Sequence, residues 1–287
     1  MPEQKFIEVS KSFFVDADFK DAFGKSGLTS IAAVFAFDAG RNLIKENLSG
    51  YRTRLQFELG SGPTTLFLKR YNKAPITVQL GNWLTARRRI SCGLWDCESA
   101  RKLAQAGINT PKTISYGEQW GTFFEKRSFC ITEKIPAAES LERKLPCCFN
   151  GPATAQTLKE RRDFIARSAA FVKKFHKTGY RHRDLYFSHI FYSKSGRFYL
   201  IDFSRAFKPV VFAERYRIKD IAQLHYSAPA KYFSKTDRLR FYLGYTGREK
   251  LSGKDKAFIG KVNSRAERMA RHDNKHGRGA PFAGQSD

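Results

Sequence analysis

Four charged residues stand in an order that points to one kind of chemistry: Lys69, Glu98, Asp184 and Asp202. Lys69 ends an apolar stretch, Glu98 lies in a helical pattern, and the two aspartates flank a short hairpin pattern. Phosphoryl transfer from ATP uses a lysine on the phosphates, a glutamate that holds this lysine, an aspartate that orients the accepting hydroxyl, and an aspartate that binds magnesium. The order of the four residues therefore predicts phosphoryl transfer.

The stretch RHRDLYFSHIF, residues 181–191, places His182, Arg183 and Asp184 among aromatic side chains, and LIDFS follows at 200–204. A His-Arg-Asp run followed by a hairpin and a second aspartate is typical of a kinase catalytic loop and its metal-binding residue. Each residue alone is commonplace, because a strand lysine usually reaches solvent and an aspartate after a strand usually caps a turn. The prediction therefore rests on their joint order.

In the first half, short apolar stretches predict strands. Apolar residues spaced three and four positions apart predict a helix over 94–106, which carries Glu98. Lys69 shares one strand face with Thr65 and Phe67, so it emerges beside apolar neighbours. GSGP at 60–63 is a turn signal. The expected strands are residues 31–37 (IAAVFAF), 53–59 (TRLQFEL), 64–71 (TTLFLKRY), 113–119 (TISYGEQ) and 128–135 (SFCITEKI).

The second half is mainly helical in pattern, with helices expected over 157–179, 217–228 and 235–245. We expect an α+β fold of two lobes. Residues 1–135 form a small antiparallel-sheet N-terminal lobe with one helix, which binds ATP, and residues 136–265 form a larger, mainly helical catalytic lobe. Residues 266–287 are polar, Gly-rich and basic and are expected to form a flexible tail.

The charge is strongly positive, with 52 Lys and Arg against 27 Asp and Glu and a formal net charge of +25. Such an excess indicates anionic partners: nucleic acid, an anionic membrane face or a phosphorylated glycolipid. No stacking-aromatic RNA-binding signature is present in the sequence, so no nucleic-acid partner is expected. Arg87 to Arg89 and the basic C-terminal region are the candidates for contact with a membrane.

The five cysteines contain no Cys-x-x-Cys pair, so we expect reduced thiols without a disulfide or a zinc ribbon. The N-terminal residues lack the basic and apolar regions of a secretory signal. The longest apolar run, 31–37, is too short to cross a bilayer. These features predict a cytoplasmic protein that contacts a membrane from the cytoplasmic side.

Several motifs resemble those of the lipopolysaccharide kinase (Kdo/WaaP) family. Members of this family phosphorylate sugars of the lipopolysaccharide inner core and are distantly related to protein kinases. The resemblance covers about Ser49 to Tyr245. It rests on SGYRTRLQFEL, FLKRY, CESARKLAQAGINTPKTISYGE, FCITEKI, HRDLYFSHIF, LIDFSRA and KDIAQLHYS. It implies ATP and Mg²⁺ as cofactors, and a lipopolysaccharide core or another lipid-linked sugar as acceptor.

The resemblance also implies a role for each matched residue, and Arg205 is a further candidate for contact with phosphate or acceptor. Lys69 would bind the ATP phosphates and pair with Glu98, Asp184 would be the catalytic base, and Asp202 would be the magnesium ligand. Glu133 would contact adenine in the hinge. Arg183 and Asp220 would brace the catalytic loop.

The sequence departs from protein kinases at four points, one of which is Ser204 in place of the glycine of Asp-Phe-Gly. No Gly-x-Gly-x-x-Gly is present in the first hairpin, so Ser49 and Gly50 are the candidates for covering the phosphates. His189 stands where a protein kinase has a metal-binding asparagine, and it is either a metal ligand or a histidine packed under the loop. No Ala-Pro-Glu follows Asp202, which argues against a protein substrate.

We therefore predict an ATP-dependent kinase for a heptose or Kdo hydroxyl of the lipopolysaccharide inner core. Two alternatives remain open: a protein or small-molecule kinase of the same fold, and a non-catalytic nucleotide-binding scaffold. The sequence leaves open which sugar and hydroxyl accept the phosphate, and the oligomeric state.

Overall fold

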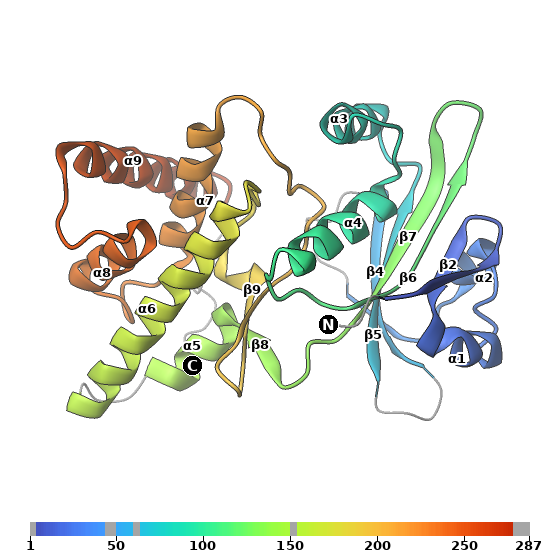
Figure 1. Cartoon of the computed structure of the whole chain (residues 1–287), viewed down its shortest axis with the longest axis horizontal. Coiled ribbons are helices and arrows are strands. Elements are labelled where there is room, and N and C mark those ends of the chain that lie inside the picture. The colour runs from blue at the N-terminus through green and yellow to red at the C-terminus, as the bar shows by residue number, and fades with distance from the viewer. Residues whose placement is uncertain (1–3, 44–49, 60–63, 150–153, 278–287) are drawn as a thin grey trace. The chain divides into compact units, whose positions relative to one another are not determined.

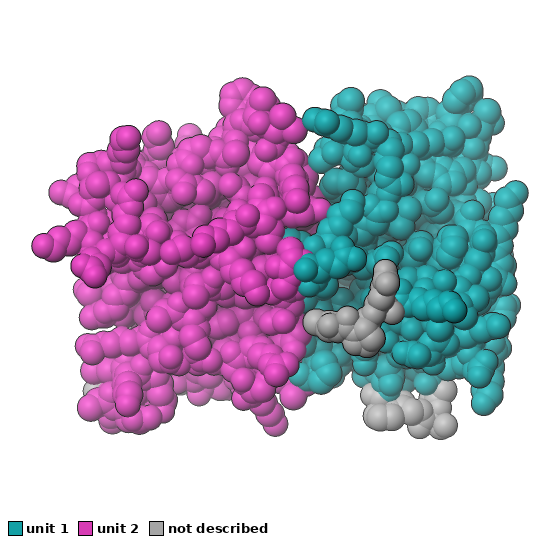
Figure 2. Space-filling model, in the orientation of Figure 1, with its two compact units in different colours: residues 1–105, 110–136 teal, residues 106–109, 137–287 magenta. Residues whose placement is uncertain are grey.

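A computed structural model describes residues 4–43, 50–59, 64–149 and 154–277 of the chain (Figure 1). The chain divides into two compact units (Figure 2). Unit 1 comprises residues 1–105 and 110–136, and unit 2 comprises residues 106–109 and 137–287. In the described residues, no helix is both long enough and apolar enough to cross a membrane.

Unit 1 is built on a seven-stranded sheet in the order β1-β2-β6-β7-β5-β4-β3, in which each neighbouring pair is antiparallel. Its strands are β1 (Phe6–Ser10), β2 (Phe13–Asp16), β3 (Arg41–Asn42), β4 (Arg52–Glu58), β5 (Thr65–Asn72), β6 (Thr113–Trp120) and β7 (Glu125–Glu133). Its helices are η1 (Ala17–Phe19), α1 (Lys20–Lys25), α2 (Ile31–Ala36), α3 (Ile76–Ala86) and α4 (Cys92–Gln105). The helix α4 packs on β5, β6 and β7.

The sheet of unit 1 confirms four of the five expected strands, whereas the strand expected at 31–37 is wrong. Residues 31–36 form the helix α2, whose first turn is capped by the Ser30 side chain accepting a hydrogen bond from the Ala33 N–H. Ile31 and Val34 are buried in the core at a helical spacing. A short apolar run fits a buried strand and a buried helix equally well, and here packing decided for the helix. The turn signal at 60–63 lies outside the described residues.

Unit 2 is mainly helical, with a small antiparallel sheet in the order β10-β9-β8. Its strands are β8 (Ala138–Ser140), β9 (Ile190–Ser193) and β10 (Phe198–Leu200). Its helices are α5 (Leu141–Phe149), α6 (Ala155–Lys177), η2 (Phe187–His189), α7 (Ala213–Ser227), α8 (Lys235–Thr246) and α9 (Gly253–Lys275). The helix α6 packs against α8, and α7 against α9. The sheet unit and the helical unit together confirm the predicted α+β class.

The last helix, α9, corrects the expected tail. Residues 266–275 belong to α9, whose buried side chains include Phe258, Val262 and Ala266 at intervals of four. The Tyr226 hydroxyl of α7 also donates a hydrogen bond to Asp273, at 2.8 Å. The many charges of this segment obscured its helical pattern of apolar residues. These few apolar side chains nevertheless pack the helix against α7.

Candidate active site

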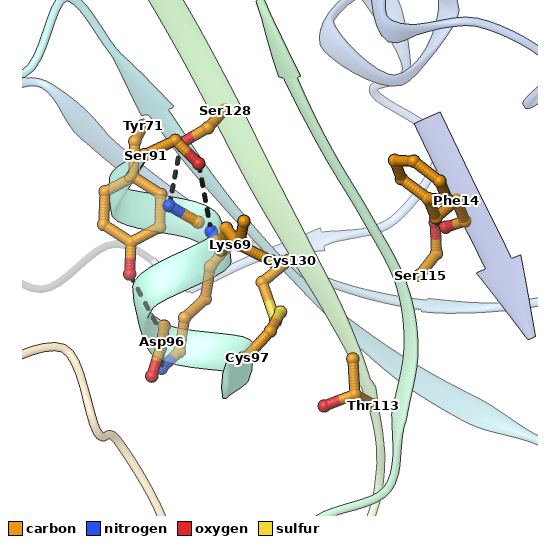
Figure 3. The surroundings of a disulfide bond; sticks show 12 residues. Phe14, Lys69, Tyr71, Ser91, Asp96, Cys97, Thr113, Ser115, Ser128 and Cys130 are labelled. Carbon is orange, nitrogen blue, oxygen red and sulfur yellow. Dashed lines mark hydrogen bonds and ion pairs between the residues drawn. A yellow bond between two sulfur atoms is a disulfide. The ribbon is translucent and has the colours of Figure 1, made fainter. Parts of the chain in front are cut away.

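Lys69, on β5, forms an ion pair with Asp96 of α4 (Figure 3). The Lys69 Nζ lies 2.7 Å from the Asp96 Oδ2, and the Tyr71 hydroxyl donates to the same oxygen at 3.1 Å. The Asp96 side chain is only 5% exposed, so both partners are shielded from bulk water on this side. A charge-assisted hydrogen bond in such surroundings holds the lysine ammonium in one place.

Glu98 does not take the role that the sequence assigned to it. It forms ion pairs with Arg88 and with Lys102, the latter at 3.1 Å. Hydrogen bonds from Lys102 and Arg88 outweigh the effect of burial and lower the pKa of Glu98. Two residues along an α-helix turn about 200° around its axis, so Asp96 and Glu98 leave opposite faces of α4. The predicted Lys69–Glu98 pair is wrong, and Asp96 holds the lysine instead.

A disulfide between Cys97 and Cys130 lies beside this ion pair (Figure 3). Cys130 on β7 is the cross-strand partner of Lys69, and Cys97 follows Asp96 on α4. The two Cα atoms are 6.4 Å apart, within the usual span of a disulfide. The expectation of reduced thiols is therefore wrong for this pair, which the fold brings together across 33 positions of sequence. Cys92, Cys147 and Cys148 are free thiols.

In unit 2, the buried carboxylate of Asp220 on α7 fixes the backbone of the predicted catalytic loop. It accepts hydrogen bonds from the N–H groups of His182 and Arg183, each at 2.8 Å. The His176 Nε2 lies 3.2 Å from the same carboxylate, and its Nδ1 lies 2.8 Å from the Tyr245 hydroxyl. Burial lowers the pKa of His176, so a neutral ring donates to Asp220 and accepts from Tyr245. The structure thus confirms the bracing role expected of Asp220.

Asp184 presents its carboxylate at the surface of unit 2, where Arg205 holds it. The Arg205 Nη1 lies 2.9 Å and 3.1 Å from the two carboxylate oxygens. The side chains of Asp184 and Arg205 are 24% and 45% exposed. An ionised carboxylate offers about four lone-pair positions, so Asp184 keeps acceptor capacity for a hydroxyl donor.

Arg183 contributes to the loop through packing. Its guanidinium lies over the rings of Phe207 and Tyr216, at 5.5 Å and 5.9 Å from their centroids. Its carbonyl oxygen accepts hydrogen bonds from the side chains of Lys219 and Gln223. These contacts give Arg183 a bracing function, at a left-handed backbone position with φ of 70°.

His189 and Asp202 lie next to one another behind the loop. The His189 Nδ1 lies 2.7 Å from the Asp184 carbonyl oxygen. Because a carbonyl oxygen only accepts, Nδ1 carries the hydrogen and donates this hydrogen bond. Burial lowers the pKa of His189, which favours the neutral ring. The Nε2 then faces Asp202, with 3.9 Å between this nitrogen and the Oδ2. Asp202 has a left-handed backbone with φ of 64°, and its Oδ1 accepts from the Ser204 hydroxyl at 3.0 Å.

The donor set at Asp202 suits magnesium in one way. In the part of the chain that the structure describes, no group of three or more His, Cys, Asp or Glu side chains is placed to hold a metal ion. Magnesium in phosphoryl-transfer sites binds through one or two carboxylates, substrate phosphates and water, so a single carboxylate such as that of Asp202 fits. The His189 nitrogen is a poorer match, because this ion prefers oxygen.

The other predicted residues are placed as follows. Glu133 ends β7, and its N–H donates to the Lys112 carbonyl oxygen at 2.9 Å, while its contact with adenine stays a prediction. Gly50 lies in the turn before β4, and Ser49 lies outside the described residues. Arg87 ends α3 with a left-handed backbone.

Comparison with known proteins bears on the whole arrangement. Residues 96–245 match the lipopolysaccharide kinase (Kdo/WaaP) family, a match over more than half of the chain. The chain belongs to this family.

Two curated relatives and one solved structure extend the match. The lipopolysaccharide core heptose(I) kinase WaaP of Escherichia coli K12 is 27% identical over 235 residues, which are 79% of this chain and 87% of that protein. The enzyme of the same name from Pseudomonas aeruginosa is 28% identical over 178 residues, which are 57% of this chain and 63% of that protein. The structure of WaaP in complex with acyl carrier protein has a TM-score of 0.66 at 22% identity and covers 90% of this chain and 99% of that one. This neighbour confirms the fold of the family.

Besides the predicted catalytic loop, this member of the Kdo/WaaP family contains an apolar cavity in unit 2 that the sequence did not reveal. Its volume is about 800 Å³, and α6, α7, α8 and α9 contribute to its walls. Apolar side chains from all four helices line it, among them Phe164, Val172, Leu224, Phe241 and Val262. The helical spacing of apolar residues predicts the helices but not a space between them.

Proposed function

We propose that this chain transfers the γ-phosphoryl group of ATP to a sugar hydroxyl, on a heptose or Kdo, of the lipopolysaccharide core. Membership of the lipopolysaccharide kinase family and the names of the bacterial relatives support this assignment. One observation carries it further: the surface carboxylate of Asp184 projects from a loop whose backbone is fixed by the buried Asp220. Such a carboxylate is held in place to receive a proton from an acceptor hydroxyl.

The residues then divide the work of the reaction. Lys69, held by Asp96, binds the phosphates and offsets the negative charge that spreads over the transferring oxygens. Asp184 orients the sugar hydroxyl and accepts its proton, so that the hydroxyl oxygen forms the new bond to phosphorus as the bond to the leaving ADP oxygen breaks. Arg205 keeps the Asp184 carboxylate in position and places a positive charge close to the reacting groups.

We assign the magnesium ion of the reaction to Asp202. Its carboxylate, oriented by the Ser204 hydroxyl, is the residue that would hold the ion together with phosphate oxygens. When bound, magnesium neutralises phosphate charge and stabilises the leaving group. The neutral His189 ring holds the Asp184 carbonyl and faces Asp202, so we assign it a positioning role for both aspartates.

The test is the transfer of radiolabelled phosphate from ATP to purified core glycolipid, with generic proteins as competing acceptors. The D184N variant should lose transfer while keeping its fold and its Mg²⁺-dependent binding of ATP, as measured by calorimetry. Retained turnover in D184N would contradict the role of Asp184. Preferential labelling of the proteins would favour the protein-kinase alternative, and the lack of any ATP binding would favour the scaffold.

We also propose that the protein works at the cytoplasmic face of the inner membrane and binds an acyl carrier protein. A lipid-linked acceptor and the net charge of +25 support the first point. The second is supported by the solved relative, which is in complex with acyl carrier protein, and by the apolar cavity of unit 2, which suits an acyl chain. Pull-down with acyl-loaded and acyl-free carrier protein tests it, and equal binding of the two would contradict a role for the cavity.

A further inference from the structure

The helix α3 of unit 1 carries three large aliphatic side chains on its outer side. Ile76, Leu80 and Leu84 are 52%, 41% and 81% exposed, and their spacing of four residues places them in one ridge along the helix. The inner face holds the polar Gln79, which is only 2% exposed, beside the half-buried Val78. A surface helix of a globular domain normally shows the opposite pattern, with its apolar stripe toward the core.

Polar contacts attach α3 to the rest of unit 1, so the fold does not use the ridge. The Gln79 side chain donates to the carbonyl oxygen of Ala74 at 2.8 Å and accepts from the N–H of Glu125 at 2.8 Å. The Trp83 Nε1 donates to the Ile90 carbonyl oxygen at 2.9 Å. These bonds fix the helix while its leucines stay in solvent.

Aromatic and basic residues adjoin the ridge. The Trp83 ring stacks on Phe124 with 5.6 Å between centroids, and the guanidinium of Arg89 lies 4.1 Å from the Trp120 centroid. Trp120 ends β6 and Phe124 lies in the turn of the β6–β7 hairpin, where Phe123 is 72% exposed. Figure 1 shows α3 and this turn at the same end of unit 1. Trp and Arg beside exposed aliphatic residues are typical of the boundary between lipid headgroups and acyl chains.

The charge around the ridge has a single sign. Residues 72–95 contain no Asp or Glu, and they include Lys73 and the run Arg87 to Arg89. Arg88 forms an ion pair with Glu98, whereas Arg87 and Arg89 are exposed. An exposed apolar ridge on a segment whose own charges are all positive complements an anionic bilayer, which offers negative headgroups above an apolar interior.

We propose that α3 and the β6–β7 turn form a membrane-docking surface, made up of Ile76, Leu80, Leu84, Phe123, Arg87 and Arg89. The ridge enters the headgroup layer of an anionic bilayer, and the arginines bind the lipid phosphates. The proposal deepens the proposed function, on which it rests, because that function requires an acceptor embedded in such a membrane. Docking by this surface brings the enzyme to a lipid-linked sugar through an element that the catalytic residues do not occupy.

The test is sedimentation of the full chain with vesicles of phosphatidylethanolamine and phosphatidylglycerol (about 7:3), and with neutral phosphatidylcholine vesicles. We expect binding to the anionic vesicles that weakens with salt. The L84S and I76S substitutions should each reduce partitioning about tenfold, because each removes an exposed apolar side chain from the ridge. R87Q should reduce it about fivefold and lessen the salt dependence. Circular dichroism checks that each variant is folded.

Two matched controls lie in unit 2: V211S replaces a valine that is 63% exposed, and R268Q removes one positive charge from α9. Both should bind vesicles like the parent chain. Equal binding by the parent chain and the L84S and I76S variants would overturn the proposal. So would variants that keep vesicle binding but lose capture of acyl carrier protein, which would assign the ridge to a protein partner. Vesicle binding needs neither ATP nor turnover, so its outcome is separate from that of the kinase assignment.

Discussion

Asp96, and not Glu98, is the carboxylate that holds Lys69, with 2.7 Å between the lysine Nζ and the aspartate Oδ2. The pair joins β5 to α4, and the disulfide between Cys97 and Cys130 joins α4 to the next strand, β7. The neighbouring residues Asp96 and Cys97 thus attach α4 to the sheet, one through an ion pair and the other through a disulfide. Both links fix the elements that carry Lys69, for which we propose phosphate binding, and its partner.

The D96N substitution should lower kcat/KM for ATP by about a hundredfold, because it removes the charge that positions Lys69. The E98Q substitution, two residues further on, should change it by less than about threefold, since Glu98 pairs with Arg88 and Lys102 at an exposed site. Steady-state phosphate transfer measures both. A larger loss in E98Q than in D96N would contradict the assignment of the lysine partner.

Breaking the disulfide should lower the free energy of unfolding by about 4 kcal/mol, as the loop-entropy relation gives for a closed loop of 33 residues. Urea unfolding of the parent chain with and without dithiothreitol measures the change, and C97S and C130S should unfold alike under both conditions. Counting thiols in the denatured, non-reduced protein is the control. Three reactive thiols are expected from the five cysteines, and five would show that Cys97 and Cys130 are reduced.

Arg205 should contribute to turnover more than to stability. Its ion pair with Asp184 is partly exposed, so R205M should cost less than about 1 kcal/mol of unfolding free energy. It should lower kcat by about tenfold to a hundredfold, because Asp184 loses its positioning partner. A single nitrogen of Arg205 contacts both carboxylate oxygens, and R205K should therefore retain most of the activity. Equal losses in R205M and R205K would mean that positive charge alone does not explain the role.

The stability of unit 2 should depend on the pH through His225. Burial, with a contribution from the nearby Arg238, lowers the pKa of His225 to about 4, whereas an unfolded histidine titrates near 6.5. The unfolded chain therefore binds the proton first, and stability is full above about pH 6.5 and falls as the pH drops toward 4. Between pH 7.5 and pH 4.5, the free energy of unfolding of the H225Q variant should therefore fall by about 2 to 3 kcal/mol less than that of the parent chain. Urea unfolding at pH 7.5 and pH 4.5 checks it, and identical pH dependence in both proteins would contradict the assignment.

The sequence was informative where a pattern is local. The two-residue period of 64–71 predicted the strand that carries Lys69, and the order of charged residues predicted the loop that carries Asp184. The partner of Lys69 depended on which face of α4 meets the sheet. A signal for it existed, because Asp96 lies midway between the buried Cys92 and Ala100 at steps of four.

Features that depend on distant parts of the chain were missed for physical reasons. The Cys97–Cys130 disulfide requires α4 to lie on β7, which no spacing of cysteines reveals. The residues 266–275 continue α9 because sparse apolar side chains dock on α7, although the segment is basic. The helix α2 forms because Ser30 caps an apolar run whose β-propensity favoured a strand.

The row of hydrogen bonds from Tyr245 through His176 to Asp220 extends from α8 to the catalytic loop. Tyr245 makes no hydrogen bond to the loop itself in the described residues. The Asp220 carboxylate only accepts, so it places the proton of His176 on Nε2, and the Tyr245 hydroxyl donates to the bare Nδ1 and holds the ring in this orientation. A substitution as mild as Y245F would thus be felt in turnover at a distance. The activity should therefore depend on α8 through this chain of hydrogen bonds.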